Sequence, residues 1–133
     1  MKYRTRRLNR RHVRRTADYV LCWLQQTLRA KDNPAIDVAV SLANSLQLPC
    51  LVYHGIRQDY PYASERFHSF LVQASGLLEQ ELQQRGIACV NYLERPDKQE
   101  RGLVYRLEER AACVVTDDQP LFVARHQAQQ LAK

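Results

Sequence analysis

Glycine is scarce in this sequence, and its placement excludes the common phosphate-binding loops. Only four glycines occur among the 133 residues, and none lies between residues 1 and 54. A dinucleotide-binding fold needs the pattern GxGxxG directly after its first strand, and a Walker loop needs a similar glycine-rich turn before a lysine. Hydride transfer with a dinucleotide and P-loop nucleotide hydrolysis are therefore not expected.

Long apolar runs, paired cysteines and catalytic motifs are also absent. No run approaches the roughly 18 residues of a membrane span, and no signal-peptide segment follows the N-terminus. The four cysteines form no CxxC pair, the four histidines show no metal-ligand spacing, and no serine sits in GxSxG. We therefore predict no catalytic residue and no metal site. Each cysteine lies in an apolar run, which favours buried, reduced thiols and a cytoplasmic location.

Basic charge is concentrated at the N-terminus. Residues 1–15 carry eight basic side chains and no acid, whereas the rest of the chain holds 12 basic and 14 acidic residues, a net charge of −2. Such an arm can bind phosphate backbones without reading sequence, or it can be a solvated leader that folds across the domain, which is the commoner case. We assign the arm to residues 1–17, and its candidate nucleic-acid contacts are Arg6, Arg7, Arg10, Arg11, Arg14 and Arg15.

Residues 18–133 read as one α/β domain, because short apolar runs alternate with segments of helical period. Asn33 and Pro34 supply an N-cap and a first helical residue. Residues 54–63, with Gly55 and Pro61, are predicted to form a loop. Strands are predicted at 19–24, 50–53, 88–93 and 112–116, and helices at about 34–46, 64–85, 102–110 and 124–132. The long second helix is expected to bury Phe67, Phe70, Leu71, Ala74, Leu78 and Leu82.

These elements predict a Rossmann-like, three-layer α/β/α fold with a parallel sheet. Right-handed crossovers favour the strand order 3-2-1-4, which reverses between the first and fourth strands. Ligands bind such sheets beyond the carboxyl ends of the strands at the reversal, here at residues 23–29 and 116–122. Because a crossover helix normally leads to another strand, we expect the final strand of the domain to be lacking.

Four segments, in this order, resemble the N-terminal α/β domain of DNA photolyases and cryptochromes. They are YVLCWLQ at 19–25, RAKDNPAI at 29–36, YASERFHSF at 62–70 and VVTDDQPLF at 114–122. The resemblance covers nearly the whole chain and is closest to the class II cyclobutane pyrimidine dimer photolyases. Class II members usually have an aromatic residue in place of Pro34 and methionine in place of Leu24, so the chain departs from the subclass at these positions.

The resemblance implies that this chain is the antenna or scaffold part of a light-driven DNA repair protein. In the family, a larger helical domain binds FAD and the damaged DNA, and this chain lacks it, so alone it is expected to be inactive. The helical domain is then missing or separately encoded, and the exposed interface could support dimerisation. The antenna chromophore would be a deazaflavin, a folate or a flavin, with FAD only in the complete protein. The implied chromophore contacts are Trp23, Gln25, Arg29, Asp117 and Asp118, and the implied domain-docking residues are Asn33, Arg66 and His68.

Two other functions stay open on the sequence. One is a stand-alone nucleotide-binding module of the universal-stress-protein type, which would require a glycine-rich phosphate loop late in the chain. The other is a nucleic-acid-binding protein that acts through its arginine-rich arm. Asp117 and Asp118 could also bind a cation or a ribose hydroxyl, or simply cap the next helix.

Overall fold

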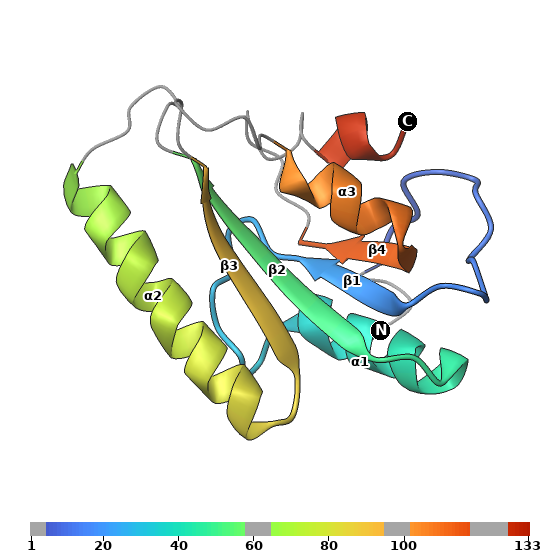
Figure 1. Ribbon diagram of the computed structural model, residues 1–133, viewed down its shortest axis with the longest axis horizontal. Coiled ribbons are helices and arrows are strands. Elements are labelled where there is room, and N and C mark those ends of the chain that lie inside the picture. Colours follow the sequence, from blue (N-terminus) through green and yellow to red (C-terminus); the bar gives the residue numbers. More distant parts are fainter. Residues whose placement is uncertain (1–4, 58–64, 95–101, 118–127) are drawn as a thin grey trace.

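Four parallel strands form one sheet, with helices on both of its faces (Figure 1). The computed structural model describes residues 5–57, 65–94, 102–117 and 128–133. The sheet order is β3-β2-β1-β4, which confirms the predicted order 3-2-1-4 and the Rossmann-like fold class. The elements are β1 (Tyr19–Trp23), α1 (Pro34–Leu46), β2 (Cys50–Arg57), α2 (Glu65–Gln84), β3 (Ala88–Glu94), α3 (Leu103–Glu109) and β4 (Ala111–Thr116).

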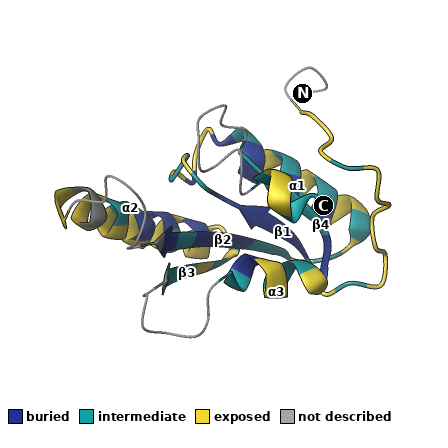
Figure 2. Ribbon diagram, turned by 90° about the horizontal axis from the view of Figure 1, so that it is seen from above, coloured by how far each residue is buried: buried dark blue, intermediate teal, exposed yellow. Residues whose placement is uncertain are grey.

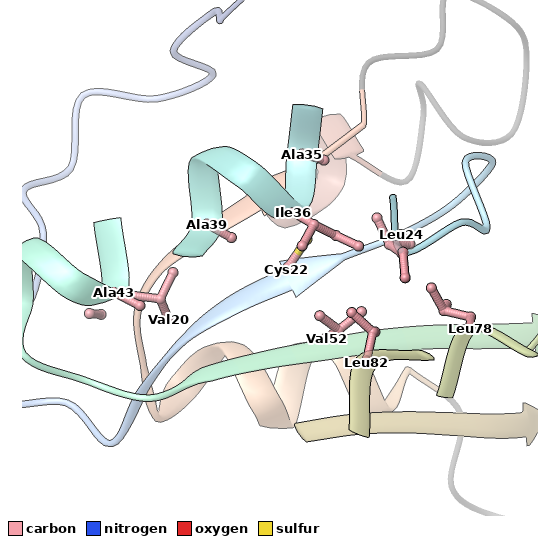
Figure 3. Packing of buried hydrophobic residues seen from close by; sticks show 12 residues of the cluster. Val20, Cys22, Leu24, Ala35, Ile36, Ala39, Ala43, Val52, Leu78 and Leu82 are labelled. Atoms are coloured by element: carbon pink, nitrogen blue, oxygen red, sulfur yellow. The ribbon is translucent and has the colours of Figure 1, made fainter. Parts of the chain in front are cut away.

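Strand β1 is buried on both faces, which explains why its sequence lacks polar alternation. On one face, Val20 and Cys22 pack under α1 and alongside the buried leucines of α2 (Figure 3). On the other face, Leu21 and Trp23 pack with Val104 of α3. The carboxyl end of β1 is therefore held between two apolar layers, and residues that follow it have a fixed starting position.

Helix α1 begins where Asn33 and Pro34 predict. The Asn33 side chain accepts hydrogen bonds from the backbone N–H groups of Ala35 and Ile36, as an N-cap does. Its amide nitrogen donates to the carbonyl oxygens of Thr27 and Arg29, at 3.0 and 2.9 Å. One buried side chain thus starts the helix and braces the loop that leads to it.

Strand β2 is longer than predicted, because residues 54–57, which we expected to begin a loop, continue the strand. They pair with β3 one by one, from His54 opposite Asn91 to Arg57 opposite Glu94. The loop was predicted in part from Gly55, which in fact lies within the strand. A Cβ atom at this position would lie 2.7 Å from the hydroxyl oxygen of Tyr53, so the glycine makes room for a neighbouring ring within a strand.

The predicted buried stripe of α2 is wrong at Phe70, whose side chain is 62% exposed. Leu78 and Leu82 are buried as predicted, and Ser75 is buried with them. Successive residues are rotated by about 100° around the helix axis, so Phe70 projects roughly 80° away from Leu78. Its side chain therefore does not reach the sheet. The side chain of Phe67, the predicted start at Ser64 and residues 124–127 of the last predicted helix lie outside the described residues.

Candidate functional site

The loop after β1 is closed by a carboxylate from the end of β4. Asp117 accepts hydrogen bonds from three consecutive backbone N–H groups: its Oδ1 from Gln25 at 2.9 Å, and its Oδ2 from Gln26 and Thr27, each at 2.8 Å. Consecutive amides that point to one spot form an anion-binding concavity. In this chain the protein's own side chain fills it, at the point where the strand order reverses.

Thr116 makes a second link between the ends of β1 and β4. Its hydroxyl donates to the carbonyl oxygen of Trp23 at 2.8 Å and accepts from the Gln25 amide nitrogen at 3.1 Å. The other end of the Gln25 amide, Oε1, is buried and has no hydrogen-bond partner among the described residues. Thr116 begins the predicted ligand-binding range 116–122, but it was not among the five residues predicted as chromophore contacts.

A cavity of about 1030 Å³ runs along β4. Its other walls are α1, the N-terminal arm and the C-terminal residues 128–132. Of the five predicted chromophore contacts, Trp23, Arg29 and Asp117 line this cavity, whereas Gln25 lies beside it and is not a lining residue. Asp118 lies outside the described residues. The structure therefore brings three of the five to one place.

Two of the three predicted docking residues, Asn33 and Arg66, do not share a surface. Asn33 has no exposed surface, and its side chain is engaged in capping α1 and bracing the preceding loop. Arg66 is exposed near the start of α2. His68 lies in the same helix, but its side chain is not among those described. The capping role that we also considered for Asn33 is what its hydrogen bonds favour.

The described part of the basic arm runs along the β4 side of the domain, beside the C-terminal residues (Figure 2). The backbone N–H of Arg14 donates to the carbonyl oxygen of Ala112 in β4 at 3.0 Å, and its guanidinium donates to the carbonyl oxygen of Glu109 at 2.9 Å. Further along, Asn9 and Arg11 donate to the carbonyl oxygens of the last two residues. Nucleic-acid binding by the arm stays a prediction. Its arginines divide into lining and non-lining sets: Arg6, Arg7, Arg11 and Arg14 line the cavity, and Arg10 and Arg15 do not.

A second polar cluster lies under α2 and was missed in the sequence. His54 Nδ1 is 2.9 Å from Ser75 Oγ, and both side chains are buried. The Asn91 amide nitrogen donates to the Ser75 carbonyl oxygen and to Glu79 Oε2, at 3.1 and 3.3 Å. Burial lowers the pKa of His54 to about 4, and neighbouring Asn91 and Asp117 oppose this only in part. Because the serine and histidine are closed to solvent, this pair joins α2 to the sheet and offers no substrate access.

The cysteines do not form a reactive or metal-binding site. All four are free thiols. Burial raises the pKa of Cys22 and Cys113, and it raises the pKa of Cys50 and Cys89 to about 11, so the nucleophilic thiolate is disfavoured. Among the described residues, no three His, Cys, Asp or Glu side chains are placed to hold a metal ion.

Comparison with known proteins identifies the family. The sequence profile named DNA photolyase matches residues 20–133. The deoxyribodipyrimidine photo-lyase of Methanothermobacter thermautotrophicus is 32% identical over 114 residues, which cover 86% of this chain and 25% of that protein. The chain thus spans about a quarter of the length of this curated relative.

A solved universal-stress-protein-family structure from Burkholderia pseudomallei also overlaps the fold. Its sequence is 11% identical, its TM-score is 0.47, and the overlap covers 84% of this chain and 88% of that one. An overlap this loose does not distinguish between functions. The photolyase matches do not separate class II members from the others, so that subclass stays a prediction. Since the matching profile spans residues 20–133 and a photolyase shares 32% of the aligned residues, the chain belongs to the DNA photolyase family.

Proposed function

We propose that this chain is the antenna-chromophore and scaffold part of a deoxyribodipyrimidine photolyase-like protein, which in complete form repairs DNA with light. The observation that supports this most is the cavity along β4, whose lining includes Trp23, Arg29 and Asp117 in the region that matches the family. FAD and the damaged DNA would be bound by a helical domain outside this chain. This chain would contribute no catalytic residue.

The cavity suits an aromatic chromophore. Val38 and Leu42 of α1 and Val115 of β4 give it an apolar wall, and Trp23 lies at its end. Its volume, about 1030 Å³, is at the upper end of the range for small-molecule sites, which is roughly 300–1,000 Å³. Arg29, which is exposed, places a cation at the same opening. A deazaflavin, a folate or a flavin combines a flat ring with polar groups and matches this lining.

The nucleotide-binding alternative has less support. In parallel α/β sheets, a nucleotide phosphate binds backbone N–H groups in the turn after a switch-point strand. Here three such groups, those of Gln25, Gln26 and Thr27, already bind the Asp117 carboxylate. A phosphate would have to displace a covalently attached anion. The scarcity of glycine also argues against a nucleotide-binding loop.

Chromophore binding can be followed by the fluorescence of Trp23, the single tryptophan. We expect saturable quenching by 8-hydroxy-5-deazaflavin, 5-formyltetrahydrofolate or flavin mononucleotide, and none by ATP. Arg29→Gln should weaken binding about tenfold, because a charge-assisted hydrogen bond is lost. Lys31→Gln is the matched control, since Lys31 is exposed close by but does not line the cavity. Binding of ATP alone would favour the nucleotide module instead.

Partner docking is proposed for one side of α2. Arg66 is exposed there, and Phe70 and Leu77, each 62% exposed, follow on the same side of the helix. Solvent-exposed apolar side chains in a row commonly mark an interaction surface. We infer that this stripe contacts the helical FAD-binding domain and, without it, supports dimerisation.

The dimerisation part of this proposal can be measured by sedimentation of the chain. Replacing both Phe70 and Leu77 by serine should raise the dimer dissociation constant at least about tenfold, because two apolar contacts are lost. Val72→Ser is the control, since Val72 is 55% exposed on the other flank of α2. An equal effect of the control would count against the stripe.

We also infer a cytoplasmic location. All four cysteines are free, which suits a reducing compartment. None of the described helices is both long and apolar enough to cross a membrane.

A further inference from the structure

We propose that the chromophore site along β4 also binds a phosphate or carboxylate group of its flavin, folate or deazaflavin ligand, and that the N-terminal arm provides the anion-binding wall. The aromatic part rests on the proposed chromophore function. The anionic part is a separate inference from the charges that line the cavity. It assigns the arm a role as part of a small-molecule site.

The lining of the cavity is strongly cationic. Among the residues that the structure describes, five arginines line it, against two carboxylates, those of Glu108 and Asp117. Both acids are already engaged, because Glu108 lies 3.7 Å from the Arg14 guanidinium and Asp117 binds three backbone N–H groups. The positive charge of the cavity lining is therefore not balanced by the acids of the described residues. A ligand with a negative group would supply that balance.

The arm arginines are held in position before any ligand arrives. Arg14 is tied to β4 and to the end of α3. Arg11 Nη2 donates to the Lys133 carbonyl oxygen at 2.6 Å, and Arg7 Nη2 donates to the Arg11 carbonyl oxygen at 2.8 Å. A guanidinium has five N–H donors, so one such bond orients the group and leaves donors for an anion. Anchoring of this kind lowers the entropy cost of binding.

The opposite wall is apolar. The apolar wall and the cationic wall would therefore bind different parts of one ligand. Val38 and Leu42 of α1 and Val115 of β4 face the cavity. An aromatic ring would cover these side chains, and an anionic tail would reach the arm. A walled cavity of about 1030 Å³ has room for one such molecule.

The test compares flavin mononucleotide with riboflavin, which has the same ring and no phosphate. We expect the full chain to bind the mononucleotide at least about tenfold more tightly. The double variant Arg7→Gln/Arg11→Gln should remove this preference and leave riboflavin affinity unchanged. The control, Arg10→Gln/Arg15→Gln, changes the charge of the arm equally at positions that do not line the cavity, and should keep the preference. Thermal unfolding checks that both variants are folded.

The outcomes separate this proposal from the chromophore function. Equal affinity for the two flavins in every variant would overturn the anion-binding wall and leave the chromophore function standing. Equal losses in both double variants would overturn it too, because a diffuse basic arm of the kind that binds nucleic acid would explain them. Arm-dependent binding of inorganic pyrophosphate, with no flavin, folate or deazaflavin bound, would support the wall and overturn the chromophore function.

Discussion

Replacing Asp117 with alanine is expected to lower the free energy of unfolding by about 3 kcal/mol. The carboxylate accepts three backbone hydrogen bonds from the loop after β1. A hydrogen bond to a charged group contributes about 1.5–3 kcal/mol, and the three are not additive because exposed Gln26 can bind water instead. Urea unfolding of the wild-type chain and the variant measures the difference.

Two further variants, Asp117→Asn and Glu81→Gln, test whether the lost stability comes from the Asp117 hydrogen bonds or from the removal of any one negative charge. The asparagine keeps one oxygen acceptor but turns an NH₂ group toward backbone donors, so most of the loss should remain. Glu81 is exposed on α2, and its change to glutamine should stay within about 0.5 kcal/mol of wild type. If Asp117→Ala also stays within that range, water satisfies the loop amides and the carboxylate is not what closes the loop.

The Asp117 contacts also show how far the sequence could locate the site. The strand order follows from the alternation of apolar runs and helical segments, and it places the ends of β1 and β4 together. That was enough to point to residues 23–29 and 116–122, and the resemblance to photolyases then implied Trp23, Arg29 and Asp117 among them. The partner atoms of Asp117 were not predictable, because they lie about 90 residues away and depend on the exact conformation of a loop.

Local signals succeeded where the physical cause is local. The cap at Asn33 needs only the following backbone, so the start of α1 was correct. The loop predicted at Gly55 and the burial predicted for Phe70 were wrong because their physical causes are not local. The glycine is placed by the Tyr53 ring within a paired strand, and the exposure of Phe70 depends on where the sheet meets α2. Both outcomes are set by tertiary packing, which overrides composition.

Stability of the chain should fall as the pH is lowered from 7.5 to 5, by about 2 kcal/mol from His54 alone. Its imidazole is buried and neutral in the fold, with a pKa of about 4, below the ordinary value of about 6.5. The unfolded chain takes up a proton through pH 6.5, whereas the folded chain does so only near pH 4. Stability is therefore constant above about pH 7 and falls between about 6.5 and 4.

Two carboxylates lie near His54. Glu79 lies across the Asn91 amide on α2, and Asp117 acts on the imidazole from the end of β4. Comparison of the wild-type chain with His54→Gln isolates the contribution of the histidine from those of its charged neighbours. His54→Gln should flatten the pH dependence measured by urea unfolding, whereas the exposed His12, changed to glutamine, should leave it intact. An unchanged slope in His54→Gln would mean that the folded chain admits the proton, and that the contact with Ser75 opens easily.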